Sequence, residues 1–297
     1  MSAGAGILFL VNPAANGGAT GRRWPELRRR AAELGLVGEQ VLSRYPGELA
    51  EAARGASGLL VVVGGDGTMN EVVDAVAGTG AELAVLPSGT GQDFGRTHGI
   101  PSRFDDAVRI ALEGDVRAVD VGRVEHTGGT RCFANVGSVG MSGAVARRAN
   151  SMTKALGGRL TFFYALTREF LAWRNTEVTV RLDGGEERSG RMHDVIVANG
   201  RWHGGGMKLA PEAAWDDGLF EVVLIGDIDK LDFATTAPKL YSGRYLSHPK
   251  VEALRSANVE VAAAEPLPIE VDGEPLGTTP ARFEVVPAAI RLRVPPA

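Results

Sequence analysis

Short apolar runs and amphipathic segments alternate along the first part of the chain. Residues 7–11 and 59–63 are compact apolar runs of strand length, and between them Leu27, Ala31 and Leu34 recur at helical spacing. The alternation continues with two further expected strands, residues 39–42 and 83–86, and two expected helices, residues 69–77 and 104–112. Short strands separated by helices predict an α/β fold with a parallel sheet covered on both faces, whose ligand site lies beyond the carboxyl ends of the strands.

The pattern changes after about residue 120. Six segments there have the composition of strands, and most are separated by turns of Gly, Asp, Asn or Pro: residues 177–182, 193–198, 219–225, 259–261, 269–271 and 283–286. Two helices are expected among them, at residues 160–173 and 231–246. The second part is therefore predicted to be β-rich and sandwich-like. We expect two domains, residues 1–124 and residues 125–297, with the last strand free to return to the first domain.

Composition and charge narrow the class of protein. Of 297 residues, 44% are hydrophobic and 23% are charged, which is typical of a soluble globular protein. The formal net charge of −4 and the lack of a Lys/Arg-rich block argue against nucleic acid as a partner.

Two further features of the composition concern the compartment. Cys132 is the only cysteine, so an internal disulfide is excluded and a reducing compartment is expected. The N-terminus lacks a cationic region, and no apolar run approaches the ~18 to 20 residues that a membrane span needs. We therefore expect a cytoplasmic protein without a transmembrane segment, and peripheral contact with the inner face of a membrane is left open.

A glycine-rich turn, GGDGT, follows the expected strand at residues 59–63. Glycine lets backbone N–H groups approach a ligand closely, and such amides bind anions at the start of a helix. Asp66 would lie among amides that face phosphate, where a bridging Mg²⁺, or hydroxyl groups of the nucleotide, would explain a carboxylate. The alternative is a tight strand-to-helix turn in which Asp66 caps the helix.

Two similar turns follow other strands of the same sheet. The sequence NPAANGG begins at Asn12, and PSGTGQDF begins at Pro87. Because the carboxyl ends of parallel strands meet at one edge of a sheet, the three turns are expected to converge. A purely structural explanation for all three is less favourable than a common nucleotide site.

Taken in order, NPAANGG, GGDGTMNEV, PSGTGQDFGR, DDGLF and VDGEP closely resemble the diacylglycerol kinase catalytic-domain family, which includes bacterial soluble lipid kinases and sphingosine kinases. The resemblance covers nearly the whole chain, whereas GGDGT alone is also similar to turns of NAD kinases and phosphofructokinases. It implies an NAD kinase/diacylglycerol kinase-like fold in which ATP lies between a nucleotide domain and a lipid-binding domain. It further implies a lipid kinase that uses ATP and Mg²⁺, with diacylglycerol as the leading acceptor and phosphatidic acid as its product. The alternatives are a sphingoid base or another hydroxyl lipid, then an NAD kinase, then a non-catalytic nucleotide-binding homologue.

The resemblance assigns a set of nucleotide-contacting positions, of which Asp66 would also act in catalysis. These are Asn12, Pro13, Ala14, Ala15, Asn16, Ser43, Gly64, Gly65, Asp66, Gly67, Thr68, Met69, Asn70, Glu71, Ser88, Gly89 and Thr90. One position departs from the family, whose third turn commonly reads GTxNDF, because Gln92 replaces the asparagine.

The segment IEVDGEPLG places two carboxylates, Asp272 and Glu274, on either side of Gly273. In a strand, residues i and i+2 point to one face, and two such carboxylates can divide the roles of general base and ionised support. Phosphoryl transfer to an alcohol needs a group that accepts the hydroxyl proton. By resemblance, Glu274 is that base and Asp272 supports it. The alternative is an Asp-Gly hairpin turn with a solvent-facing glutamate.

The segment Asp216-Asp217-Gly218-Leu219 resembles the family's structural Mg²⁺ site. Asp217 and the Leu219 carbonyl match the family's ligands, but Ala214 stands where some bacterial members have an aspartate. Asp216 or a water molecule would then complete the site, and an ordinary Asp-Gly turn is the alternative.

For most of the remaining residues with reactive or aromatic side chains, the sequence favours structural roles. The five histidines lack zinc-site spacing, with His203 expected in a loop, and Cys132 is expected to be buried. The aromatic stretch at residues 159–173 is either a helix that covers the core or one that meets lipid. The expected partner is a lipid substrate at a membrane surface, and a homodimer is left open.

Overall fold

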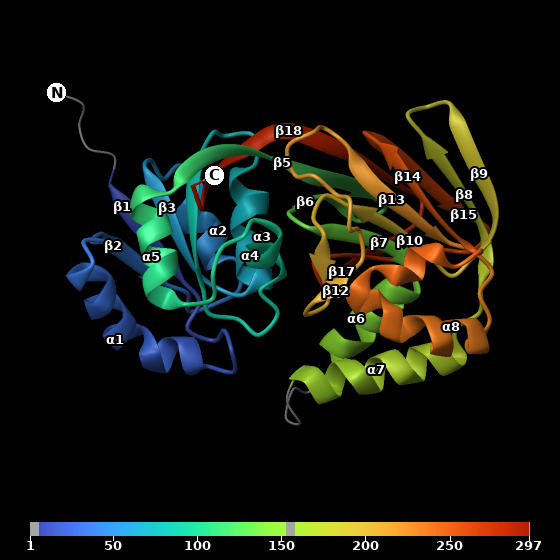
Figure 1. The fold of residues 1–297 in the computed structure, drawn as a ribbon, viewed down its shortest axis with the longest axis horizontal. Helices are drawn as coiled ribbons and strands as arrows, with labels where there is room; N and C mark the ends of the chain where they lie inside the picture. The colour runs from blue at the N-terminus through green and yellow to red at the C-terminus, as the bar shows by residue number, and fades with distance from the viewer. Residues whose placement is uncertain (1–5, 153–157, 297) are drawn as a thin grey trace. The chain divides into compact units, whose positions relative to one another are not determined.

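The computed structural model describes residues 6–152 and 158–296, which form two compact units. The first unit comprises the chain up to Val121, the short segment Trp215–Asp217 and the chain from Val286 onward. The second comprises Gly122–Ala214 and Gly218–Val285. Two long strands, β5 (Asp115–His126) and β18 (Ala281–Val294), begin in one unit and end in the other (Figure 1).

The first unit is built on a parallel sheet. Its strands follow the order β2 (Glu39–Leu42), β1 (Ile7–Val11), β3 (Leu59–Gly64) and β4 (Glu82–Pro87). The end of β18 extends the sheet beyond β4, since Arg291 and Leu292 pair in parallel with Glu82 and Leu83. The predicted parallel sheet is thus confirmed, and its apolar strands are buried as such sheets require.

Five helices accompany this sheet: α1 (Ala19–Glu33), α2 (Glu48–Ala53), α3 (Asp66–Val76), α4 (Asp93–Thr97) and α5 (Phe104–Glu113). Helix α1 lies beside α5, and α3 lies beside α2 and α4 (Figure 1). The helix expected at residues 69–77 begins three residues earlier, because Gly65 is extended and occupies the N-cap position. This start places the whole DGT segment in the first helical turn.

The second unit contains two antiparallel sheets. In one, β9 (Glu186–Met192), β8 (Thr176–Leu182), β15 (Asn258–Ala263) and the beginning of β18 follow one another, and β6 (Gly129–Phe133) pairs with the end of β5. The other has the order β14 (Val251–Ser256), β13 (Phe220–Ile225), β10 (Asp194–Ala198), β7 (Val136–Gly140), β16 (Pro268–Val271) and β17 (Glu274–Thr278). A separate hairpin joins β11 (Trp202–His203) to β12 (Met207–Lys208).

A single apolar core joins these two sheets. Val180, Val261 and Phe283 come from one sheet, and Val195 and Ile269 come from the other. This packing confirms the β-rich, sandwich-like fold of the second part. Side chains alternate between the two faces of a strand, so the neighbours of these core residues along each strand point to the opposite face of the six-stranded sheet. Several of those neighbours are polar.

The helices of the second unit are α6 (Met141–Ser151), α7 (Gly158–Ala172) and α8 (Lys230–Thr236), followed by two 3₁₀ turns, η2 (Ala237–Ser242) and η3 (Arg244–Ser247). The helix expected at residues 231–246 is interrupted because Pro238 lies in the first turn of η2 and Gly243, with φ 72°, ends η2.

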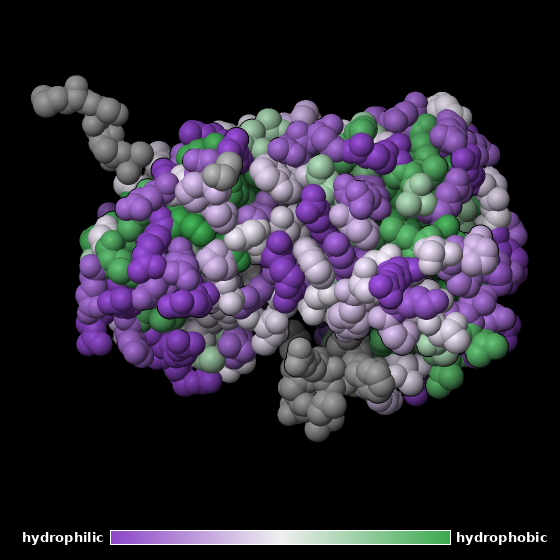
Figure 2. Space-filling model, in the orientation of Figure 1, coloured by the Kyte–Doolittle hydropathy of each residue, from purple (hydrophilic) through white to green (hydrophobic). Residues whose placement is uncertain are grey.

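The aromatic stretch on α7 has both packed and exposed side chains. Phe170 of α7 stacks on Phe233 of α8 with ring centroids 4.4 Å apart, which is a packing role. Leu171 and Leu231 are exposed, and Figure 2 shows apolar side chains at the surface over this region. Among the described residues, no helix has the length and hydropathy to cross a bilayer. Cys132, expected to be buried, is half-buried in β6, where the strand is near the sheet's edge.

Candidate active site

Three glycine turns lie together at the carboxyl ends of β1, β3 and β4. The Asn12 N–H donates to the Val63 carbonyl (3.0 Å), and the Asn12 side-chain amide donates to the Thr68 hydroxyl oxygen (2.9 Å). The Ser88 N–H donates to the Gly64 carbonyl (2.8 Å). These bonds link the first and third turns to the second, so the predicted convergence of the three turns is confirmed.

A fourth segment joins the turns at the start of α1. The hydroxyl oxygens of Thr20 and Ser88 are 2.6 Å apart, and the Thr20 hydroxyl also donates to the Ser88 carbonyl (3.2 Å). Thr20 is buried, and it belongs to none of the motifs in the sequence. Its only signal is its position just after NPAANGG.

Glycine is required at two close approaches between the turns. A Cβ at Gly89 would lie 2.5 Å from the Gly65 Cα, and a Cβ at Gly91 would lie 2.5 Å from Asp66 Oδ2. Neither glycine has a positive φ, so the requirement is steric. The consequence is a stretch of bare backbone beside the N-terminus of α3, where the first helical N–H groups have no partner within the helix.

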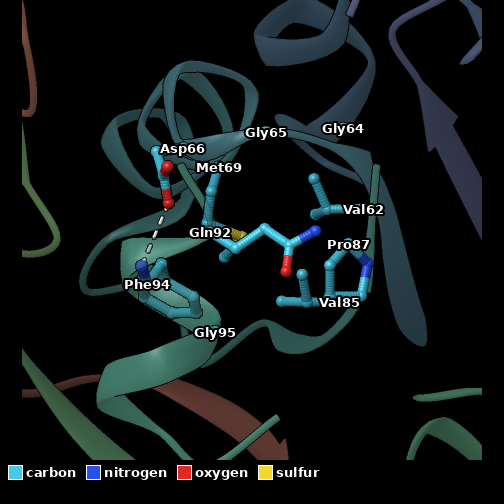
Figure 3. A pocket seen from close by; sticks show the side chains of 10 residues that line it. All are labelled: Val62, Gly64, Gly65, Asp66, Met69, Val85, Pro87, Gln92, Phe94 and Gly95. Atoms are coloured by element: carbon cyan, nitrogen blue, oxygen red, sulfur yellow. Dashed lines mark hydrogen bonds between the residues drawn. The ribbon is translucent and has the colours of Figure 1, made fainter. Parts of the chain in front are cut away.

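Asp66 connects α3 to α4. It is the first residue of α3, and its Oδ1 accepts a hydrogen bond from the Phe94 N–H at 3.0 Å (Figure 3). The alternative that Asp66 is the helix cap is wrong, because Gly65 holds that position and no side chain caps the helix. Its carboxylate lies at the positive end of α3, where negative charge is favoured.

A small hollow lies behind the second and third turns. Its lining residues are Val62, Gly64, Gly65, Asp66, Met69, Val85, Pro87, Gln92, Phe94 and Gly95 (Figure 3). The Gln92 side chain lies in it, and its amide donates to the Gly89 carbonyl at 3.1 Å. Gln92 itself has φ 56°, a left-handed conformation. Gln92, which replaces the family's asparagine, therefore helps to set the conformation of the third turn.

The other predicted nucleotide contacts differ in exposure. Ala14, Asn16, Gly67 and Thr90 are exposed at the tips of the turns. Half-buried positions are Pro13, Ala15 and Ser43, of which Ser43 follows β2 and donates its N–H to the Val11 carbonyl (2.9 Å). These positions border the converging turns.

Two of the predicted nucleotide contacts, Asn70 and Glu71, are buried or bonded to other parts of the protein. Asn70 has no exposed surface, and neither polar atom of its side chain has a partner among the described residues. Glu71 accepts the N–H groups of Leu49 and Ala50, both at 3.2 Å, and so satisfies the start of α2. Their contact with nucleotide stays a prediction.

In the second unit, Asp272 and Gly273 form a two-residue turn between β16 and β17. Their φ angles are 48° and 84°, and Val271 pairs with Glu274 across the turn. The expectation that Asp272 and Glu274 share one face of one strand is wrong, because two successive left-handed residues reverse the chain between them. Glu274 is the first residue of β17 and is exposed, with the Asn150 amide 3.5 Å from its Oε2.

The Asp272 carboxylate is held by backbone amides. It accepts hydrogen bonds from the N–H groups of Ala134 (2.7 Å), Asn135 (3.0 Å) and Val136 (2.9 Å). Burial raises the pKa of Asp272 to about 6, although the Val136 and Ala134 amides favour its ionised form. Asp272 therefore anchors the turn that carries Glu274.

Behind this turn lies a buried carboxylate that the sequence did not reveal. Glu270 is 1% exposed and accepts hydrogen bonds from the Ser138 hydroxyl (2.8 Å) and the Gly273 N–H (2.7 Å). His203 Nε2 lies 3.3 Å from its Oε1. His203, expected in a loop, is in β11 and faces this carboxylate. Burial alone would raise the pKa of Glu270, but His203, Ser138 and Gly273 hold it below its ordinary value.

A second buried acid, Asp194, lies on the same sheet. It is 4% exposed, and its Oδ2 accepts hydrogen bonds from the Ser142 N–H (3.1 Å) and the Ser142 hydroxyl. Burial raises the pKa of Asp194 to about 8, and the charge of Glu270 adds to this effect. Asp194 is therefore mostly neutral at pH 7, whereas Glu270 is ionised.

The predicted Mg²⁺ ligands near residue 217 lie in a short exposed segment. Asp216 and Asp217 are exposed at the end of the segment that belongs to the first unit, and Leu219 belongs to the second. Across residues 6–152 and 158–296, no group of three or more His, Cys, Asp or Glu side chains is placed to hold a metal ion. A site built from Asp217, the Leu219 carbonyl and Asp216 stays a prediction.

Comparison with known proteins identifies the family. The diacylglycerol kinase catalytic domain matches residues 6–124, and the YegS C-terminal NAD kinase beta sandwich-like domain matches residues 135–294. The chain belongs to the diacylglycerol kinase family. These matches confirm the family that the sequence motifs resemble. They also confirm that the protein is a lipid kinase by class.

Individual members of the family are similar over most of their length. The "Probable lipid kinase YegS-like" of Xanthomonas euvesicatoria is 32% identical over 85% of this chain and 82% of its own. The "Diacylglycerol kinase" of Mycobacterium tuberculosis is 28% identical over 83% of this chain and 80% of its own. The crystal structure of a diacylglycerol kinase from Bacillus anthracis shares the fold, with a TM-score of 0.73 at 18% identity, covering 99% of this chain and 98% of that one.

Proposed function

We propose that the protein is an ATP-dependent lipid kinase that transfers the γ-phosphoryl group of Mg-ATP to a lipid hydroxyl, with diacylglycerol as the first acceptor to test. The observation that carries this proposal is the meeting of three glycine turns at one sheet edge in a chain of this family. The names of the relatives support the acceptor class.

The first unit would bind the nucleotide. The bare backbone of Gly65 and Gly89, where a Cβ at Gly89 would collide with the Gly65 Cα, fits a triphosphate that approaches amides directly. The N-terminus of α3 adds N–H groups that have no acceptor within the helix, and Asn12 and Thr90 would contribute polar side chains. Mg²⁺, when held through Asp66, would neutralise charge on the transferred group.

The second unit would supply the general base. Glu274 would accept the proton of the acceptor hydroxyl while its oxygen forms a bond to the γ-phosphorus. The bond from that phosphorus to the β–γ bridging oxygen breaks, and ADP leaves. Asp272, anchored on three amides, would keep the turn in place for this transfer.

The decisive experiment supplies [γ-³²P]ATP and Mg²⁺ with mixed micelles of defined lipids. We expect label on diacylglycerol, and we expect Glu274→Gln to lower kcat by at least ~100-fold, within the range attributed to general base catalysis. Asp66→Asn should abolish turnover and weaken Mg-ATP binding. Wild-type turnover in the Glu274→Gln variant would show that the base is wrongly assigned.

The acceptor alternatives are separate arms of the same experiment. Label on a sphingoid base instead of diacylglycerol would change the substrate and keep the mechanism. Phosphorylation of NAD without lipid would replace the proposal with an NAD kinase. ATP binding with no labelled product from any acceptor would indicate a non-catalytic nucleotide-binding protein.

A further inference from the structure

Glu270 connects three separate parts of the second unit. Its carboxylate receives the Ser138 hydroxyl from the neighbouring strand β7, faces His203 of the β11–β12 hairpin, and receives the Gly273 N–H from the turn. The distances are 2.8, 3.3 and 2.7 Å. The Gly273 amide belongs to the residue directly before Glu274, so this carboxylate touches the backbone that carries the proposed base.

The protonation states of the pair follow from these partners. An ionised carboxylate only accepts hydrogen bonds, so the His203 nitrogen that faces it must carry a proton. The nearby acid Asp194 does not compete for the negative charge, because it is neutral at pH 7. Glu270 is thus a buried anion with a donor from each of three elements.

A contribution to folding stability does not by itself explain why a charged glutamate is buried at position 270. A buried ion pair is often replaced by well-packed apolar residues with no loss of stability, whereas removal of one partner is costly. Here the buried charge is next to a turn whose two residues both have left-handed φ angles. A turn of only two residues sets the direction in which the following side chain leaves the backbone.

We propose that Glu270, supported by His203, is a positioning residue that holds the Asp272–Gly273 turn and thereby sets the orientation of Glu274. The proposal rests on the function proposed above. The turn is anchored at both of its residues: the Asp272 carboxylate accepts from the amides of residues 134–136 and the Asp272 N–H donates to the Val136 carbonyl, whereas the Gly273 N–H donates to Glu270. Without Glu270 the remaining bonds all belong to Asp272, and the Gly273 N–H, next to Glu274, loses its acceptor.

The central test compares Glu270→Gln with Glu221→Gln. Glu221 is a matched control because it is also a buried acid on the six-stranded sheet, but it accepts the Glu212 N–H and is separated from β16 by two strands. In Glu270→Gln, we expect kcat to fall by about 100-fold, the effect of a small misplacement of a reacting group. KM for ATP should be unchanged, and Glu221→Gln should keep wild-type kcat.

A second pair of variants tests the role of His203. His203→Gln retains an N–H donor that can reach Glu270, whereas His203→Leu removes it. We expect His203→Leu to lower kcat in the same way as Glu270→Gln, and His203→Gln to restore most of the activity. Equal kcat values in the two His203 variants would overturn its supporting role.

Amide hydrogen exchange measured by NMR separates this proposal from the proposed function. The Gly273 amide should be protected in the wild-type protein and should exchange much faster in Glu270→Gln, while the amides of Ala134 and Val136 stay protected. If the wild-type protein phosphorylates no lipid, the proposed function fails and exchange still decides whether Glu270 holds the turn. Wild-type kcat in Glu270→Gln, or an unchanged exchange rate at Gly273, would overturn the inference.

Discussion

Gln92 has a backbone conformation that suits few residue types. Its φ of 56° is in the left-handed region, which glycine and asparagine tolerate better than residues with longer side chains. The family's asparagine at this position therefore has a conformational reason. The Gln92 side chain partly compensates through its bond to the Gly89 carbonyl.

We expect Gln92→Asn to raise the free energy of unfolding by up to about 1 kcal/mol, because it relieves the cost of the left-handed conformation. Urea denaturation followed by circular dichroism would measure the change. Gln92→Ala is the control, since it loses the bond to Gly89 without an easier φ, and it should be destabilised. An asparagine variant less stable than the wild type would contradict this account.

Asp272 and Glu274 are two residues apart but should respond differently to substitution. Asp272→Asn leaves three N–H donors facing a group with one acceptor oxygen, so we expect a loss of about 1–3 kcal/mol in unfolding free energy. Glu274 is exposed, and Glu274→Gln should change stability by less than about 0.5 kcal/mol while turnover is lost. Equal effects of the two variants on stability would contradict the division into anchor and base.

At the scale of elements, the three turns act as one unit because glycine lets them approach. Gly89→Ala would place a Cβ 2.5 Å from the Gly65 Cα, so the second and third turns must separate. We expect a loss of about 1–3 kcal/mol in stability, typical of overpacking, and at least ~10-fold weaker ATP binding by calorimetry. Gly185→Ala is the control, because a Cβ there meets nothing within 4 Å and φ is not positive. An alanine at 89 with wild-type ATP affinity would show that the approach of the turns is unimportant for the ligand.

Many of the strands and helices could be predicted from the sequence, and individual elements show why. Strand β1 matches its expected range, since an apolar run bounded by turn residues defines a buried strand, and β2 also matches although it is an exposed strand at the edge of the sheet. Helix α3 starts earlier than expected because its N-cap residue is Gly65, which has no side chain to mark the start of the helix. The turn at Asp272 differs from the continuous strand predicted there and agrees with the alternative, since Asp-Gly is a strong hairpin signal.

At the scale of the whole molecule, the contacts that local patterns cannot reveal are those between distant segments. Glu270 and His203 are 67 residues apart, and no motif pairs them. Asp66 and Phe94 are 28 residues apart and become neighbours only when α3 and α4 are placed. The sequence could predict which turns meet, because strand ends share an edge, but not which side chains are buried behind them.

Stability should fall as the pH rises from 6.5 to 8, because Asp194 holds its proton more tightly in the folded state. Its pKa is raised to about 8 by burial, whereas an unfolded aspartate titrates near ~3.9. A raised carboxyl pKa stabilises the fold fully below the unfolded value, and this contribution is lost as the pH rises through the folded value. Two buried histidines oppose part of this loss, because burial lowers the pKa of His98 to about 3 and of His193 to about 4, whereas an unfolded histidine, with a pKa of ~6.5, still gives up protons above pH 6.5. Each histidine adds about 0.4 kcal/mol of stability between pH 6.5 and 8. At about 1.4 kcal/mol per pH unit of full linkage for Asp194, the expected net loss over this range is about 1 kcal/mol.

Asp194→Asn provides the matched comparison for this pH dependence, because the amide keeps an oxygen for the Ser142 donors and cannot titrate. Urea denaturation at pH 6.5, 7.25 and 8 should show a free energy of unfolding that falls with pH for the wild type and rises slightly for the variant, in which only the buried histidines still respond. A fall of equal slope in the two proteins would assign the proton to another group. A rise of equal slope in the two proteins would mean that the Asp194 carboxyl is already ionised at pH 6.5, so that Asp194 and Glu270 would both be charged.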